Sequence, residues 1–157
     1  MKILVVIVNY RTAEMTLDSA EAAMRELSAY PDARIRIVDN DSQDGSLEVL
    51  KEGLLHSRWG EDWASRIDVL GTSYNGGFAY GCNAAIRPAL DSDDPPDYVY
   101  LLNSDAFPDA GAIDRLVEYL DSHPETGIAG SYIHGVGGYD DTHHTAFRFP
   151  SIASEFE

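Results

Sequence analysis

Apolar residues occur along the chain in short runs, and most runs are followed by a stretch in which they recur every three or four positions. Short β-branched and aliphatic runs are typical of strands buried on both faces. Recurrence at three and four positions is typical of helices with one buried face. The predicted strands are 3–8, 34–39, 67–70, 98–102 and 127–133, and helical spacing follows each of the first four.

This alternation predicts an α/β fold with a mostly parallel sheet and helices on both faces. The first helix is expected to be capped by Thr12 and to end near Tyr30 and Pro31. Residues 134–145 are dominated by glycine, aspartate and histidine, and the chain then stops a few residues into what looks like a new element. We therefore expect the sequence to be cut short from a longer protein.

The charge balance narrows the classes of partner. The chain has 27 acidic and 11 basic side chains, which give a formal net charge of -16 at pH 7. Such a field repels nucleic acid and anionic lipid headgroups, so no nucleic-acid partner is expected. A nucleotide diphosphate can still bind if a divalent cation lies between its phosphates and the carboxylates of the protein.

Cysteine usage and the N-terminus indicate a cytoplasmic location. Cys82 is the only cysteine, and the N-terminus lacks the pattern of a secretory signal. The longest apolar run has about a third of the ~20 residues that a membrane-spanning helix needs, so no transmembrane segment is expected. Cys82 could act as a nucleophile, although a small buried filler is the commoner role for such a residue.

Polar residues directly follow three of the predicted strands. In open α/β sheets ligands bind at the carboxyl ends of the strands, so these positions are candidates for a site. A carboxylate such as Asp39 can accept the imide N–H of uracil or thymine, a donor that adenine lacks. A turn or helix cap is the alternative role for Asp39 and its neighbours. The three segments are 9–11, 39–42 and 103–105.

Asp105 is the candidate metal ligand. It follows an apolar strand, and Mg²⁺ or Mn²⁺ takes only one or two protein carboxylates when substrate phosphates supply other oxygens. The alternative is that Asp105 simply starts a loop before Pro108. His143 and His144 are weaker candidates, because adjacent residues in extended chain point opposite ways and a solvated loop explains them.

A glycine-rich segment at 75–83 leads into a helix, whose N-terminal amides favour anions. It lacks the Gly-Lys-Ser/Thr of a P-loop, and the first strand is followed by Asn-Tyr-Arg instead of a dinucleotide-binding glycine motif. These absences disfavour a P-loop NTPase and a nicotinamide-dependent dehydrogenase.

Residues 3–10, 38–46, 75–83 and 101–106 form four blocks that occur in order along the chain. Together these blocks resemble family 2 glycosyltransferases of the GT-A fold, a Rossmann-like fold, and are closest to the rhamnosyltransferase-like branch. The resemblance implies a UDP- or dTDP-sugar donor, a divalent metal and transfer to a saccharide or lipid-linked acceptor with inversion. The donor-binding residues that the resemblance implies are Val8, Asn9, Tyr10, Asp39, Asn40, Asn75, Gly77, Gly81, Asn83, Asn103, Ser104 and Asp105.

The sequence departs from the family pattern in two ways. Asn103 stands where the first acid of the Asp-x-Asp metal motif would be, so the metal is expected to bind more weakly. Nothing before Glu157 matches the catalytic base, which we expect beyond that residue. We therefore expect residues 1–133 to form the donor-binding domain and 134–157 to begin an acceptor-side region. The chain alone is expected to bind donor without efficient transfer, in the cytoplasm or at the inner face of the membrane.

Two other functions are compatible with the pattern. A sugar nucleotidyltransferase would share the architecture and the metal, but it usually opens with a glycine-rich basic loop, and residues 9–16 contain one arginine and no glycine. A non-catalytic nucleotide-binding or interaction module would use the same sheet edge. Neither alternative is excluded by fold, because fold alone does not fix function.

Overall fold

The computed structural model of the chain describes residues 1–55, 63 and 65–135. These belong to two compact units, Met1–Gly111 and Ala112–Glu157, which are considered separately. The first unit contains β1 (Ile3–Asn9), α1 (Ala13–Glu26), η1 (Leu27–Ala29), β2 (Arg34–Asp39), α2 (Ser46–Leu55), β3 (Ile67–Gly71), α4 (Phe78–Leu90) and β4 (Tyr98–Asn103). The second contains α5 (Ala112–Ser122).

The four strands form one parallel sheet in the order β3-β2-β1-β4. Strand β1 lies inside the sheet and is buried along its whole length, as its continuous apolar sequence predicts. Its residue Val8 pairs with Val38 of β2 on one side and with Asn103 of β4 on the other. The α/β fold with a parallel sheet is therefore confirmed.

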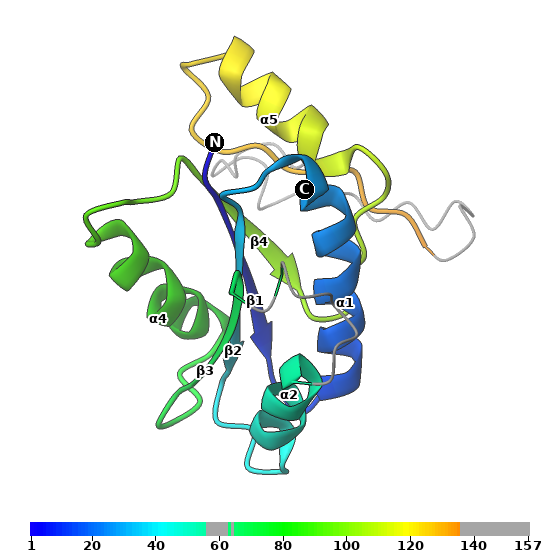
Figure 1. Cartoon of the computed structure of the whole chain (residues 1–157), viewed down its shortest axis with the longest axis vertical. Coiled ribbons are helices and arrows are strands. Elements are labelled where there is room, and N and C mark those ends of the chain that lie inside the picture. Colours follow the sequence, from blue (N-terminus) through cyan, green and yellow to red (C-terminus); the bar gives the residue numbers. More distant parts are fainter. Residues whose placement is uncertain (56–62, 64, 136–157) are drawn as a thin grey trace, which may run out of the picture. The chain divides into compact units, whose positions relative to one another are not determined.

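Helices cover both faces of the sheet: α1 and α2 lie on one face and α4 on the other (Figure 1). Leu4, Val6 and Val8 form the core beneath α4 together with Cys82 and Ala85. Residues of β1 between them point to the opposite face, because side chains alternate along a strand. Helices on both faces of the sheet thus explain why the sequence of β1 is continuously apolar.

Two expectations about local structure are corrected. Residues 127–133 form no strand: Ile128 is 91% exposed, and a Cβ added at Gly127 or Gly130 would touch nothing within 4 Å. A buried strand needs neighbours on its faces, and among the described residues Gly127, Ile128 and Gly130 have no such covering layer. Thr12 precedes α1 but makes no side-chain cap, because its hydroxyl bonds other partners at the sheet edge.

The structure bears on the remaining expectations only in part. None of the helices among the described residues is long and apolar enough to cross a bilayer. His143 and His144 lie outside the described residues. The compact units divide after Gly111, whereas the predicted donor domain ends at 133; the functional boundary stays a prediction.

Candidate functional site

The order of the strands reverses at β1. From β1 the chain moves outward through β2 to β3, then returns so that β4 pairs with the other side of β1. In doubly wound sheets, ligands bind at the carboxyl ends of the strands that flank such a reversal. Here the hydroxyls of Thr12, in the loop after β1, and of Ser104, after β4, are hydrogen-bonded at 3.2 Å. The two loops therefore meet at the expected place.

Asn9 ends β1 as a fully buried amide that joins three segments. Its Nδ2 donates to Asp39 Oδ1 at 2.6 Å and to Ser42 Oγ at 3.2 Å. Its Oδ1 accepts from the backbone N and Oγ1 of Thr12, both at 3.2 Å, and from Thr16 Oγ1 at 2.9 Å. The side chain fixes the end of β1 to the start of α1 and to the end of β2.

Asp39 is 4% exposed and is held by the turn that follows β2. Its Oδ1 accepts from Ser42 Oγ at 2.5 Å as well as from Asn9, while Oδ2 accepts from the Ser42 backbone amide at 3.2 Å. Hydrogen bonds to an ionised carboxylate are stronger than neutral ones. The carboxylate therefore organises this edge, and Oδ2 keeps the greater accepting capacity.

Arg11 is held in an uncommon backbone conformation beside this turn. Its φ is 62°, its backbone N–H donates to Ser42 Oγ at 3.0 Å, and its Nε donates to Ser42 O at 3.1 Å. The guanidinium carbon lies 5.0 Å from the centre of the half-exposed Tyr10 ring. Across the loops that follow all four strands, each fully described, Arg11 is the only lysine or arginine.

Strain accumulates in the same place. Besides Arg11, the turn after β2 contains two further non-glycine residues with positive φ, Asp41 at 56° and Gln43 at 55°. Each such residue costs of order 1 kcal/mol or more and persists only where its surroundings fix it. Here Ser42 holds the turn in place. Backbone strain of this kind is typical of functional sites.

Asn40 extends the edge toward the loop between β3 and α4. Its Nδ2 donates to Asn75 Oδ1 at 2.9 Å and to Gly77 O at 3.1 Å, while its Oδ1 accepts from Thr72 Oγ1 at 3.3 Å. Asn75 Oδ1 also accepts from the Gly77 amide at 2.9 Å. Gly77, at φ 83°, then begins the turn into α4 in a conformation suited to glycine.

The same loop carries an aromatic pair. The rings of Tyr74 and Tyr80 lie 4.6 Å apart between centroids, and a Cβ at Gly76 would come within 2.4 Å of Tyr80 Cγ. The pKa of Tyr74 is raised above its ordinary value, mainly by desolvation and to a smaller extent by the nearby Tyr80. Glycine at position 76 therefore allows the loop to close over Tyr80 while Tyr74 stays half-exposed.

Asp105 fits the role of a shared metal ligand. It is exposed, and its carboxylate makes no hydrogen bond or ion pair with any residue that the structure describes. Within the described ranges, no three histidine, cysteine or acidic side chains come together to hold an ion by themselves. A free carboxylate suits Mg²⁺ or Mn²⁺ that completes its shell with phosphate oxygens and water. Asn103, also exposed, lies two residues before it.

Some predicted site residues lie in the core instead of at the exposed edge. Val8 is buried against Gly81, where a Cβ would lie 2.8 Å from Val8 Cγ1. Cys82 is 5% exposed, and burial raises the pKa of its thiol, which suits a filler better than a nucleophile. Asn83 is exposed on α4. The donor-binding roles of Val8, Gly81 and Asn83 stay predictions.

The sequence places Arg11 and Ser42 in the candidate segments after the strands without assigning either a specific role, and it does not single out Thr72. The available signal was their position, since each lies within three residues of the end of a strand. The structure uses the hydroxyls of Ser42 and Thr72 to hold Asp39, Arg11 and Asn40.

Solved structures of other proteins share the fold of the chain. The mannosyltransferase PcManGT from Pyrobaculum calidifontis, in complex with GDP-Man and Mn²⁺, is 18% identical with a TM-score of 0.62, over 75% of this chain and 32% of that one. S. aureus TarS 1-349, in complex with UDP-GlcNAc, is 18% identical with a TM-score of 0.60, over 79% of this chain and 32% of that one. The chain thus spans about a third of the length of these structures.

At such low identity these likenesses show the fold alone, and they confirm the GT-A-like architecture. No curated protein matches the sequence. The sequence profile described as "Glycosyl transferase family 2" matches residues 4–156, nearly the whole chain. The chain therefore belongs to glycosyl transferase family 2.

Proposed function

We propose that the chain binds a nucleotide diphospho-sugar at the carboxyl edge of its sheet, as the donor half of a sugar-transferring enzyme. The observation that carries the proposal is the meeting of the loops after β1, β2 and β4 where the strand order reverses. We propose a UDP- or dTDP-sugar as donor, transfer to a hydroxyl with inversion, and a place in the rhamnosyltransferase-like branch. Family membership supports the reaction class.

The nucleobase is assigned to the edge formed by Asp39, Asn40 and the loop at Asn75 and Gly77. Asp39 Oδ2 accepts one hydrogen bond, from the Ser42 amide, so it retains capacity for the imide N–H of uracil or thymine. Asn40 joins this carboxylate to the glycine loop, which brings backbone close to the ligand. Tyr10, half-exposed beside them, offers an aromatic face.

The diphosphate is assigned to Arg11 and Asp105. Arg11 uses Nε to hold Ser42, so the two terminal nitrogens of its guanidinium can donate to phosphate oxygens. Asp105, with Asn103 and Ser104 beside it, would hold Mg²⁺ or Mn²⁺ against the diphosphate. When bound, the metal supplies charge neutralisation for the departing diphosphate.

Transfer has a second requirement, which is removal of a proton from the acceptor hydroxyl as it attacks the anomeric carbon. We assign no catalytic base in this chain. We propose that these 157 residues bind donor without transferring it at an enzymatic rate. We further propose a cytoplasmic site of action, at the inner face of the membrane if the acceptor is lipid-linked, in the synthesis of cell-wall or other polysaccharide.

Calorimetric titration of the chain with UDP and with dTDP, each with and without Mn²⁺, tests the donor site. We expect binding that needs the metal, that is lost in Asp105→Ala and that is weakened in Asp39→Ala. Asp109→Ala is a matched control, because Asp109 is an exposed acid in the same loop after β4. Circular dichroism of each variant separates lost binding from lost folding.

Two results would contradict the proposal. One is the absence of binding by either nucleotide with Mn²⁺ present, both by this chain and by a longer chain that includes any residues after Glu157. The other is unchanged metal-dependent binding in a folded Asp105→Ala variant. Normal transfer by the 157 residues alone would overturn the proposed division of labour while leaving the donor site intact.

A further inference from the structure

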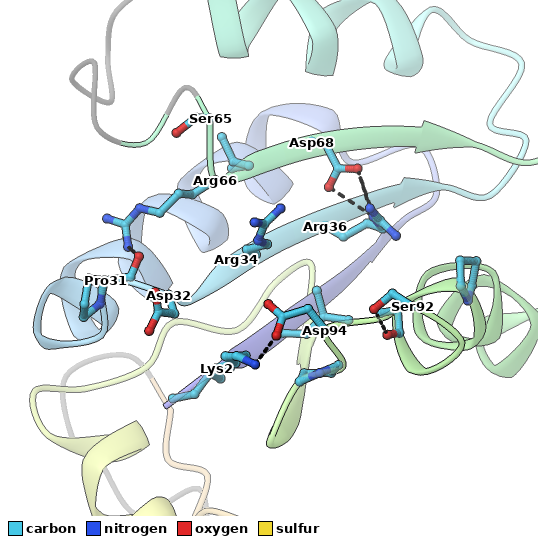
Figure 2. A pocket seen from close by; sticks show the side chains of 16 residues that line it. Lys2, Pro31, Asp32, Arg34, Arg36, Ser65, Arg66, Asp68, Ser92 and Asp94 are labelled. Carbon is cyan, nitrogen blue, oxygen red and sulfur yellow. Dashed lines mark hydrogen bonds and ion pairs between the residues drawn. The ribbon is translucent and has the colours of Figure 1, made fainter.

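A cavity of about 830 Å³ opens at the amino ends of β1, β2 and β3, beside the C-terminal end of α4 (Figure 2). The strands are parallel, so their amino ends form the edge opposite to the one that carries Asn9, Asp39 and Asp105. The cavity is therefore separate from the proposed donor site, and the donor does not account for it.

Basic side chains gather in this cavity. Lys2, Arg34, Arg36 and Arg66 all line it, which is four of the eleven lysines and arginines in a chain of net charge -16. Lys2 and Arg66 directly precede β1 and β3, while Arg34 and Arg36 lie at the start of β2, so the sheet brings together residues from three separate parts of the sequence. A local concentration of cations in an acidic protein points to a ligand of negative charge.

Three of the four cations are fixed by partners. Lys2 pairs with Asp94, and Arg36 Nε donates to both carboxylate oxygens of Asp68, at 3.1 and 2.9 Å. Arg66 Nη1 donates to two backbone carbonyls of the turn before β2, at 3.0 and 3.2 Å. These contacts hold the side chains in place around the cavity.

Arg34 differs from the other three. It is exposed, and its guanidinium makes no hydrogen bond or ion pair with any residue in the described ranges. It lies two positions before Arg36 on β2, hence on the same face, and the pairing of Ile35 with Ile67 brings it level with Arg66. In Figure 2 its side chain stands between those of Arg36 and Arg66, within the cavity.

We propose that this cavity is a binding site for a compact phosphate group, free or on a small organic molecule, with Arg34 as the principal ligand. A guanidinium presents its donors in a planar fork that matches two oxygens of a phosphate. Arg66 adds positive charge around the same point, whereas the charge of Lys2 is offset by its ion pair with Asp94. Pro31, Pro88 and Pro96 in the lining provide apolar surface for an organic substituent.

The charge distribution favours a small ligand over a polyanion. Asp32, Asp68 and Asp94 also line the cavity, and the rest of the chain is strongly acidic. The lining has four cations against three carboxylates, an excess of one positive charge. At physiological ionic strength charges are screened beyond about 8 Å, so a small anion in contact with Arg34 experiences this local excess more than the distant acids. A nucleic acid or an anionic membrane would extend past the cavity and meet the acidic surface.

Titration of the ¹⁵N-labelled chain with inorganic phosphate, at ionic strength held constant with NaCl, tests the site by NMR. We expect saturable shifts of the amide signals at 34–36 and 66–68. In Arg34→Ala the affinity should fall about tenfold or more, as for the loss of a charge-assisted hydrogen-bonded pair. Arg25→Ala is the matched control, because Arg25 is exposed, pairs with Glu21 and does not line the cavity.

Phenyl phosphate and acetate identify the chemistry of the ligand. Tighter binding of phenyl phosphate than of inorganic phosphate indicates a phosphate on an organic body, and equal binding indicates free phosphate. Acetate should bind more weakly than either. The proposal is overturned if phosphate causes no saturable shifts, if the shifts fall only at the edge around Tyr10 and Ser42, or if Arg34→Ala and Arg34→Gln bind phosphate like the unmodified chain.

Discussion

Asn9, Asp39 and Ser42 form one buried polar cluster at the end of two strands. Every hydrogen-bonding atom of the Asn9 side chain has a partner, and Asp39 Oδ1 accepts from both other members of the cluster. A buried polar network in which every group is hydrogen-bonded makes a site rigid. A group left without a partner in such a network costs free energy. The cluster therefore couples the shape of the candidate site to the stability of the sheet.

Replacement of Asp39 by Asn tests this coupling. An amide retains the size of the carboxylate, but it has one accepting oxygen where the cluster requires two accepting positions. We expect the free energy of unfolding to fall by about 1–3 kcal/mol, as for a buried donor left without a partner. Urea denaturation followed by circular dichroism measures the loss, and Asp93→Asn, an exposed acid in a loop, should be neutral. Equal stability of the two variants would contradict a structural role for Asp39.

Arg11 carries the second prediction at the scale of single residues. Asn is the suitable replacement, because it tolerates the positive φ of this position while removing the guanidinium. We expect Arg11→Asn to bind UDP about tenfold more weakly and uridine with unchanged affinity, since only the diphosphate would contact Arg11. Titration calorimetry with both ligands measures the difference, and Arg25→Asn serves as the control. A parallel loss of uridine binding would instead show that Arg11 shapes the base pocket.

The sequence predicted where single site residues lie along the chain, but not whether their side chains are buried or exposed. The sequence places Asp39 and Asp105 at strand ends, and the structure puts both there. It does not reveal that Asp39 is buried while Asp105 is exposed, because the burial of Asp39 depends on Ser42 and on the left-handed residues of the turn after β2. Hydroxyl partners are chosen by tertiary geometry, which a short motif does not encode.

At the scale of elements, α4 and β1 approach each other closely at Gly81. A Cβ at Gly81 would lie 2.8 and 3.1 Å from the two γ carbons of Val8, a stiff β-branched side chain. We expect Gly81→Ala to destabilise the chain by about 1–3 kcal/mol, because the helix or the strand must shift. Gly127→Ala is the matched control, since a Cβ there meets nothing within 4 Å. The prediction fails if urea midpoints of the two variants agree.

Elements with many apolar neighbours were the ones that sequence predicted well. Strands β1 to β4 and helices α1, α2, α4 and α5 all lie where the apolar spacing indicates. The predicted strand at 127–133 is wrong because its apolar residues are separated by glycines and Ile128 has no covering layer. Apolar composition alone does not make a strand; a partner strand and a covering face are also needed.

At the scale of the whole molecule, the net charge of -16 dominates the electrostatics. Among the described residues the ion pairs are few and partly exposed, and such pairs contribute about 0–1 kcal/mol each. Repulsion among the remaining acids opposes the compact state, and salt screens it. We therefore expect the free energy of unfolding to rise by on the order of 1 kcal/mol as NaCl is added, and the urea midpoint to rise with it.

Urea is the appropriate denaturant for this test, because it is uncharged and leaves the ionic strength unchanged. The rise should level off as the screening length falls from about 10 Å at 0.1 M toward 3 Å at 1 M salt. If the amino-edge cavity binds phosphate, sodium phosphate should raise the midpoint further than NaCl at equal ionic strength, and Arg34→Ala should abolish only that excess. A midpoint that falls with NaCl would mean that ion pairing outweighs repulsion, and the acidic surface would then be stabilising in its folded arrangement.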